Sequence, residues 1–217
     1  MTIIGRGQMA ATSAQASLET SLARLDDDGR ALLFTEARTA NTFSDRPVTG
    51  EQLREIYELM KWGPTWSNTL PLRIVYVTTP DGKARLLPHL QPGNVGKAAQ
   101  APVNAILAVD SAFHHQIRRL FPSRAGMRDA LEADPGLRDK IGTGGAWMQA
   151  AYFIIAVRAA GLAAGPMGGF DPAGLDAEFS PSGDWRSFLI VNIGYPGQSP
   201  WYEHLPRLDY AKAVRHA

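Results

Sequence analysis

The sequence predicts an α+β fold, with a mixed sheet flanked by helices in one compact domain. Three runs rich in β-branched and aliphatic residues lie among stretches of helical periodicity, without the regular strand–helix–strand alternation of a doubly wound sheet. The chain has 217 residues, of which 45% are hydrophobic and 20% charged, so it is long and apolar enough to bury a sizeable core. Together these observations favour an α+β domain.

Residues 1–30 differ in composition from the rest of the chain. They are rich in Ala, Ser and Thr and end in the acidic run 26–28, and three leucines form a helical stripe, Leu18, Leu22 and Leu25. We expect a mobile arm with a short surface helix here. The folded domain is expected over residues 31–217.

Three helices are predicted from terminal signals and periodicity. Over residues 49–61, Thr49 and Gln52 fit a capping box, and the expected buried face holds Leu53, Ile56, Tyr57 and Met60. Residues 146–161 are apolar on most sides and end at a glycine, which indicates a buried helix. A short helix is predicted over residues 172–179, behind the N-cap Asp171.

Three central strands are predicted over residues 74–77, 103–109 and 188–193. Each run is rich in Val, Ile or Leu and is bounded by polar residues, Pro or Gly. The three runs supply the sheet of the predicted α+β domain.

The composition excludes several classes of function. Lys and Arg total 22 against 21 Asp and Glu, so the net charge of +1 gives no field that would hold nucleic acid or an anionic membrane. The absence of cysteine excludes thiolate metal sites and cysteine nucleophiles, so redox chemistry requires a bound cofactor. No apolar run approaches the ~18 residues of a membrane span, and the N-terminus lacks an apolar signal core. A cytoplasmic location is therefore expected.

Familiar catalytic motifs are absent from the sequence. The glycines at 142, 144 and 145 do not complete GxGxxG because position 147 is Trp, and there is no GxxxxGK[ST], GxSxG or HExxH. His114 and His115 on a helix would point about 100° apart, so we expect solvated histidines there and no metal site.

Four segments combine polar side chains with glycine or proline in otherwise ordered surroundings. Each taken alone is also compatible with a simple turn, connecting loop or helix start. Residues 37–43 could surround an anion, and residues 63–71 form a polar loop held by prolines. Asn94 and Lys97 share one face of a helical turn, and the glycines of residues 165–171 would let backbone N–H groups approach a flat ligand.

Taken together, these segments resemble the FMN-dependent nitroreductase family, and within it the subgroup that contains malonic semialdehyde reductase. The resemblance covers residues 32–213 and is carried by five stretches, Leu53-Arg54-Glu55-Ile56-Tyr57, Leu59-Met60-Lys61-Trp62-Gly63-Pro64-Thr65, Met148-Gln149-Ala150-Ala151-Tyr152, Gly165-Pro166-Met167 with Gly169-Phe170-Asp171, and Asn192-Ile193-Gly194-Tyr195 with Leu205-Pro206-Arg207-Leu208. It implies an interlocked homodimer with two FMN sites at the interface, and NADH or NADPH as hydride donor.

The resemblance also implies which residues bind the cofactor. Arg38, Thr39, Asn41 and Arg207 correspond to the phosphate-binding residues, with Ala37 and Asn41 departing from the usual cationic pattern. The loop that the partner subunit lays over the flavin corresponds to residues 64–68, with Pro64, Thr65, Trp66 and Asn68, where Trp66 replaces a small residue. Asn94 and Lys97 match the pair at the pyrimidine end, and Met167, Gly168 and Gly169 match the segment facing N5 and O4.

The implied activity is an FMN-dependent NAD(P)H oxidoreductase with ping-pong kinetics. No side chain is needed as a nucleophile, because flavin N5 receives and donates the hydride, and Lys97 would stabilise negative charge at N1. The acceptor is a 3-oxo acid such as malonic semialdehyde, or a nitroaromatic or quinone. A lid over residues 113–142 would set the specificity for the acceptor. It carries four arginines, Arg118, Arg119, Arg124 and Arg128. They either bind an acceptor carboxylate or a nucleotide phosphate, or they form a solvated basic face. The alternative function is a flavin carrier or sensor without acceptor turnover.

Overall fold

The computed structural model describes residues 24–217, and the chain divides into two compact units, residues 1–37 and 38–217. In the described part of the first unit, helix α2 (Asp27–Arg30) is capped by Asp26, whose carboxylate accepts a hydrogen bond from the Gly29 amide at 2.8 Å. A π-helical turn, η1 (Ala31–Thr35), follows. The expected leucine stripe begins outside the described residues, and the domain boundary at residue 31 stays a prediction.

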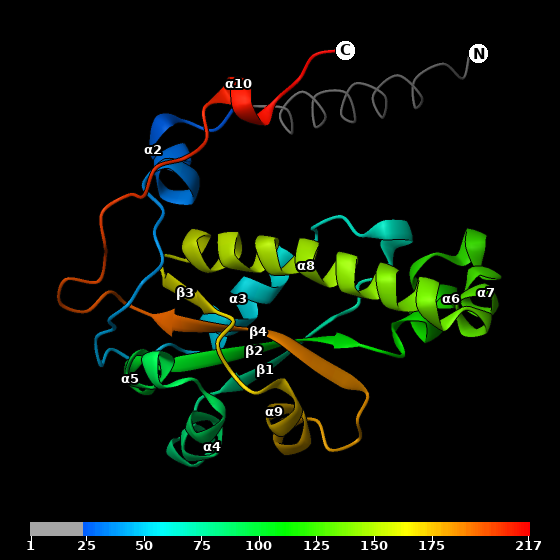
Figure 1. Cartoon of the computed structure of the whole chain (residues 1–217), viewed down its shortest axis with the longest axis horizontal. Coiled ribbons are helices and arrows are strands. Elements are labelled where there is room, and N and C mark those ends of the chain that lie inside the picture. Colours follow the sequence, from blue (N-terminus) through cyan, green and yellow to red (C-terminus); the bar gives the residue numbers. More distant parts are fainter. Residues whose placement is uncertain (1–23) are drawn as a thin grey trace, which may run out of the picture. The chain divides into compact units, whose positions relative to one another are not determined.

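The second unit is built on a four-stranded antiparallel sheet with the order β1-β2-β4-β3, which confirms the predicted α+β class (Figure 1). The strands are β1 (Leu72–Val77), β2 (Val103–Asp110), β3 (Ala163–Met167) and β4 (Trp185–Gly194). The three predicted strands are present and longer than expected, but β1 lies at an edge and is not central. The sequence pattern missed β3, whose Pro166 is tolerated because an edge strand can lack one N–H.

Helices α3 (Gly50–Met60) and α8 (Pro135–Ala159) cover one face of the sheet. The capping box of α3 is confirmed, since Thr49 Oγ1 accepts the Gln52 amide at 3.2 Å and the Gln52 side chain accepts the Thr49 amide at 3.1 Å. Ile56 and Met60 are buried as predicted, but Tyr57 is 50% exposed. The expectation for Tyr57 was wrong because the apolar residues of α3 occupy a wider stripe than the sheet and α8 cover, and Tyr57 lies outside the covered part.

Helix α8 begins eleven residues before its predicted start, behind the N-cap Asp134. At two of its glycines, neighbours pack directly against the helix. A Cβ on Gly142 would lie 2.8 Å from the Phe113 ring, and one on Gly145 would lie 3.0 Å from Pro71. At the other end, Gly161 has φ +74° and terminates the helix as predicted.

Helices α4 (Pro80–Leu86), α5 (Pro92–Gln100) and α9 (Pro172–Phe179), with the turn η3 (Leu87–His89), cover the opposite face. They form a second core with the facing side of the sheet, centred on Leu86, Ala98, Ile106, Leu175 and Ile190. Helix α9 has the predicted bounds and the predicted cap, because the Asp171 carboxylate accepts the Ala173 amide at 3.1 Å.

A group of short helices follows β2 at one end of α8 and forms most of the predicted lid (Figure 1). It consists of η4 (Phe113–Gln116), α6 (Ile117–Leu120), η5 (Pro122–Arg124) and α7 (Met127–Ala133). The group has its own small core of Phe113, Ile117 and Leu131. Residues 113–133 are called the lid below.

Two segments lie outside these layers. The short turn η2 (Trp66–Asn68) precedes β1, and helix α10 (Tyr210–Ala213) lies near the end of the tail that follows β4. Across residues 24–217, no helix is both long enough and apolar enough to span a bilayer.

Candidate cofactor site

The segment from Arg38 to Phe43 lies against the β3 edge of the sheet. The Ala40 amide donates a hydrogen bond to the Ala164 carbonyl at 3.0 Å. A Cβ on Gly165 would lie only 2.6 Å from the Ala40 carbonyl oxygen, so glycine is what allows the two backbones to approach. The predicted phosphate-binding residues Arg38 and Thr39 are thereby held beside β3.

The tail after β4 closes the other side of this segment. The Asn41 amide donates to the Pro200 carbonyl at 3.0 Å, and the Thr42 hydroxyl donates to the Gln198 carbonyl at 2.7 Å. The Asn41 side chain donates to the Thr39 carbonyl at 3.2 Å. Asn41 therefore orders its own turn.

The second part of the site joins the start of α5 to the segment that follows β3. Asn94 Nδ2 donates to the Gly169 carbonyl at 2.8 Å, and the Gln91 amide donates to the same oxygen at 3.0 Å. A Cβ on Gly169 would lie 2.6 Å from Asn94 Nδ2, so this contact also depends on glycine. Lys97 follows Asn94 by one helical turn and is half-buried.

The neighbouring glycines mark open space beside these donors. A Cβ at Gly93, Gly96 or Gly168 would meet no atom within 4 Å. Met167 points away from this space, because its side chain is 6% exposed and its sulfur lies 3.7 Å from Asn192 Nδ2 in the core. Any contribution of Met167 to a ligand is thus limited to its backbone.

Residues 64–68 lie at the opposite edge of the sheet, directly before β1. Thr65 and Pro71 pack near Gly145 of α8, and Asn68 Nδ2 donates to the Leu120 carbonyl of the lid at 2.9 Å. Three strand spacings, roughly 14 Å, separate the β1 and β3 edges. The single chain therefore does not bring this loop to Asn94 and Lys97.

Arg207 lies in the exposed tail, and its hydrogen bonds are local. Its Nη1 donates to the Leu205 carbonyl at 2.8 Å and to the Pro206 carbonyl at 3.3 Å. These contacts do not tie Arg207 to Arg38, so the predicted pair of phosphate cations is not assembled by them.

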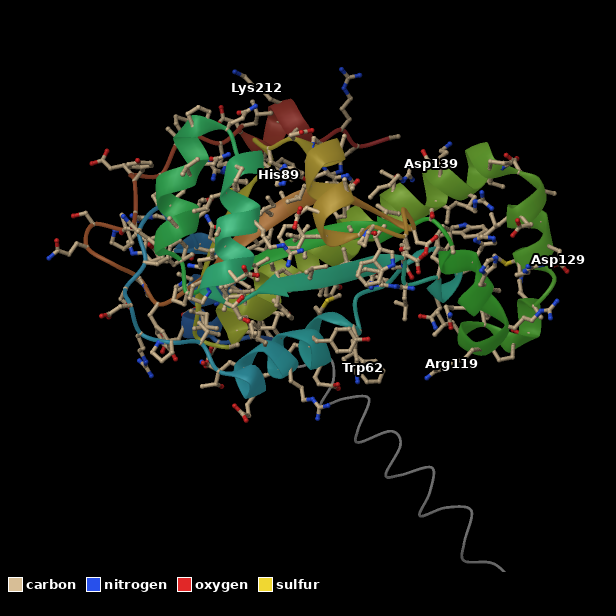
Figure 2. All side chains as sticks on the ribbon, turned by 90° about the horizontal axis from the view of Figure 1, so that it is seen from below. Trp62, His89, Arg119, Asp129, Asp139 and Lys212 are labelled. Carbon is tan, nitrogen blue, oxygen red and sulfur yellow. The ribbon has the colours of Figure 1, made fainter. Side chains whose placement is uncertain are left out.

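A cleft of about 790 Å³ lies at the β1 edge between α3, β1 and the lid, and it contains none of the predicted cofactor residues. Its charged lining includes Arg54, Glu58, Lys61, Arg73 and Arg119. Figure 2 shows Arg119 projecting from the lid on the side of Trp62, which follows the end of α3. Sequence reasoning missed this cleft, although the spacing of Arg54, Glu58 and Lys61 on one predicted helix could have indicated a charged wall.

The lid carries a charge network that corrects the expectation for His114, which is buried, whereas His115 is exposed as expected. His114 is 2% exposed, and its Nε2 lies 2.6 Å from Glu132 Oε2, while His115 Nε2 lies 3.3 Å from the same oxygen. Hydrogen bonds from His114 and then His115 lower the pKa of Glu132. The two rings converge because Glu132 of α7 packs across η4, a contact that the helical spacing of adjacent residues does not predict.

Two guanidinium groups complete this network. Arg138 Nη1 lies 3.8 Å from Glu132 Oε1 and Arg128 Nη2 lies 3.9 Å from Oε2. Arg128 also pairs with Asp129 at 2.8 Å, and Arg118 lies 3.9 Å from Asp129. Arg118 and Arg128 therefore pair with Asp129 within the lid, whereas Arg119 lines the cleft.

Large apolar side chains are exposed on α3, on α8 and along the tail. Trp62 is 80% exposed, Leu205 75% and Leu208 76%, and Trp147, Met148 and Tyr152 form an exposed stripe on α8. Large apolar side chains left exposed in this number are typical of a protein interface.

Comparisons with known proteins agree on one family. The family model described as the nitroreductase family matches residues 35–195. A Streptomyces coelicolor protein named "Putative NADH dehydrogenase/NAD(P)H nitroreductase" is 49% identical over 198 residues, which cover 91% of this chain and 98% of that protein. A Streptomyces griseus protein of the same name is 47% identical over 190 residues, covering 88% and 96%.

Solved structures share the fold at lower identity. A nitroreductase family protein from Streptococcus pneumoniae superposes with a TM-score of 0.75 at 18% identity, covering 85% of this chain and 98% of that one. A protein of Exiguobacterium sibiricum in complex with FMN gives 0.78 at 13% identity, covering 89% and 99%. Because the family model spans most of residues 31–217 and relatives are nearly half identical, the chain belongs to the nitroreductase family.

Proposed function

We propose that this protein transfers hydride from NADH or NADPH, through FMN bound at the β3 edge, to a small acceptor. As a nitroreductase-family member it is an NAD(P)H-dependent oxidoreductase with FMN as its cofactor. Residues 31–217 are proposed as the FMN-binding domain. The observation that supports the position of the cofactor is the convergence of three separate segments, residues 38–41, 94–97 and 167–169, along one strand.

The side chains at this edge fit FMN. Arg38 and Lys97 supply two cations, Asn94 and Thr39 supply neutral polar groups, and a Cβ on Gly168 would meet no protein atom within 4 Å. A flat, anionic molecule with a phosphate at one end matches this arrangement. When bound, FMN supplies hydride chemistry, accepting a hydride from the nicotinamide and returning it to the acceptor.

The protein's own residues bind and tune the site. Lys97 places a positive charge where reduction creates negative charge, and Asn94 fixes the Gly169 carbonyl and hence the course of residues 167–169. Arg38 and Thr39, held by the Ala40 contact with β3, bind the phosphate, and Arg207 supplies a second cation. No side chain is required as a nucleophile.

The site is completed by a second copy of the chain. The loop of residues 64–68 lies at the wrong edge of its own sheet, so in our proposal it reaches the flavin of the partner subunit. The exposed apolar surface on α3, α8 and the tail supports a homodimer, and sedimentation analysis is expected to give a dimer with about one FMN per chain. A monomer loaded with FMN would contradict this arrangement.

The acceptor is either a 3-oxo acid such as malonic semialdehyde or a nitroaromatic or quinone. Arg119 in the cleft and the half-exposed Trp66 are the groups that would distinguish a carboxylate from an aromatic ring. The names of the Streptomyces relatives favour including nitroaromatics in the first panel.

Anaerobic reduction tests the proposed function. The purified protein should be yellow, lose its colour on addition of NADH or NADPH, and regain it when an acceptor is added. A yellow protein that does not bleach would support a flavin carrier or sensor and refute the oxidoreductase. Rates with malonic semialdehyde, 4-nitrobenzoate and menadione then rank the acceptor classes.

A further inference from the structure

We propose that Asn104 is a positioning residue for Lys97. Together with Asn192 it fixes the end of α5 against the sheet, and so sets the position of the Lys97 ammonium group and the reduction potential of bound FMN. The proposal rests on the proposed function, because that function places Lys97 beside the flavin. Neither asparagine is among the residues assigned to the cofactor.

Asn104 and Asn192 form a polar pair inside an apolar core. They lie directly opposite each other on β2 and β4, and both are 0% exposed. Their neighbours on the same face of these strands are Ile106 and Ile190, which belong to the core beneath α4, α5 and α9. Burial of an amide side chain is costly unless it is hydrogen-bonded, so the bonds of this pair show what it holds.

Both hydrogens of the Asn104 amide are used. Nδ2 donates to the Ala98 carbonyl at 3.1 Å and to Asn192 Oδ1 at 2.8 Å. Ala98 lies in the last turn of α5, and the residue four places later is Pro102, which has no N–H to offer that carbonyl. The Asn104 side chain therefore takes the place of a helical hydrogen bond next to Lys97.

The pair also reaches the strand on the other side of β4. Asn192 Nδ2 lies 3.7 Å from Met167 Sδ. Met167 leads into the segment 167–169, where the Gly169 carbonyl accepts the hydrogen bond from Asn94 at the start of α5. Helix α5 is thus linked to residues 167–169 at both of its ends, directly through Asn94 and across the sheet through the asparagine pair.

Stability alone does not account for the pair. Among residues 24–217, Asn104 Oδ1 is a buried acceptor without a hydrogen-bond partner. Such an atom costs free energy that a leucine of nearly the same size would avoid. The network therefore loses stability at one atom while it fixes a helix end, and buried polar networks of this kind specify one geometry of the core.

A second contact keeps α5 docked when Asn104 is changed. Lys83 Nζ donates to the Ala99 carbonyl at 3.0 Å and also to the Ala101 carbonyl at the same helix end. Loss of the Asn104 bond should therefore displace the last turn of α5 and not undock the helix. A displacement is enough to change the potential, because the interaction between two charges falls with their separation.

The test measures the potential of FMN bound to each variant by anaerobic titration against a dye of known potential, with a chemical reductant. Asn104→Leu keeps the size and removes the donor, and Asn104→Ala avoids any clash if the leucine variant does not fold. Leu175→Ala is the matched control, because Leu175 is fully buried in the same core but lies on α9. Lys97→Met, alone and combined with Asn104→Ala, tests whether Asn104 acts through the ammonium group.

In both Asn104 variants, reduced FMN should lose about threefold to tenfold more affinity than oxidised FMN, which is a fall in the two-electron potential of roughly 15–30 mV. Leu175→Ala should lower the Tm of the apo protein and leave the potential unchanged. In the Lys97→Met background, Asn104→Ala should cause no further fall, because two residues that act through one interaction are not additive.

An unchanged potential in the Asn104 variants would overturn the proposal. An equal fall in the Leu175→Ala control would overturn it as well, since the effect would then follow from general loss of stability. A full further fall in the Lys97→Met background would show that Asn104 acts by another route. If the wild type is reduced by the chemical reductant but not by NADH or NADPH, the proposed function fails, while the effect of Asn104 on the potential is still measured.

Discussion

Replacement of Gly165 by alanine should separate the phosphate-binding segment from the sheet. The added Cβ would lie 2.6 Å from the Ala40 carbonyl oxygen, about 0.8 Å inside the 3.4 Å at which ordinary contact begins. Both groups belong to backbone that is hydrogen-bonded, so neither can rotate away as a side chain could. The Ala40 amide should then lose its bond to the Ala164 carbonyl.

The expected cost combines two terms. A lost backbone hydrogen bond costs about 0.5–1.5 kcal/mol, and over-packing of a close contact costs about 1–3 kcal/mol. Gly165→Ala should therefore lower the free energy of unfolding by roughly 1.5–4.5 kcal/mol. For a chain of this size that corresponds to a fall in Tm of roughly 3–18 °C in the apo protein. FMN affinity should fall as well, because Arg38 and Thr39 move with Ala40.

Gly168→Ala is the matched control three residues later. Its Cβ would meet no protein atom within 4 Å, so the Tm of the apo protein should stay at the wild-type value. The open space beside Gly168 is where we place the flavin, so FMN affinity should fall at least about tenfold by the same steric reasoning.

Differential scanning fluorimetry of the apo proteins and titration of FMN fluorescence measure the two effects separately. An unchanged Tm for Gly165→Ala would refute the steric argument at β3. Wild-type FMN affinity in Gly168→Ala would refute the placement of the cofactor beside that glycine.

Four further substitutions test charges. Lys97→Met should lower the two-electron potential of the bound flavin by roughly 20–60 mV, because about 1–3 kcal/mol of interaction with the reduced anion is lost. Anaerobic titration against a dye of known potential measures this shift. An unshifted potential in FMN-loaded protein would reject the role of Lys97 in stabilising the reduced flavin. Arg38→Ala and Arg207→Ala should each weaken FMN binding by about 10- to 100-fold, because each loses a charged hydrogen bond that contributes roughly 1.5–3 kcal/mol. If fluorescence titrations give the same FMN affinity for both variants and wild type, the two arginines do not bind the phosphate. The pKa of Glu132 is lowered, so its contribution to stability is present above its ordinary pKa and is lost as pH falls through the lowered value. The Tm of wild type, measured by scanning fluorimetry, should therefore fall toward acid pH more steeply than that of Glu132→Gln. Parallel profiles for the two proteins would contradict the role of Glu132.

The sequence by itself determined the elements that local interactions specify. The N-caps Thr49 and Asp171 each bond to amides within three residues, so the starts of α3 and α9 could be predicted from neighbouring residues alone. Gly161 fixed a helix end for the same reason, through its own positive φ. The three predicted strands are rich in Val, Ile and Leu, a pattern that can be identified without knowledge of their partners.

Strand β3 and the site along it were decided only by the tertiary structure. Its residues lack a strand pattern, and β3 exists because Ala163–Met167 pair with residues 190–194 of β4. The resemblance predicted the residues of the candidate site, but pairing of β3 with β4 brings residues 38–41 and 167–169 to one edge and leaves residues 64–68 at the other. Contacts between segments that are distant in sequence also placed His114 and His115 on one carboxylate and tied Asn68 to the lid. Such contacts depend on how the layers pack, and no pattern within a single segment encodes them.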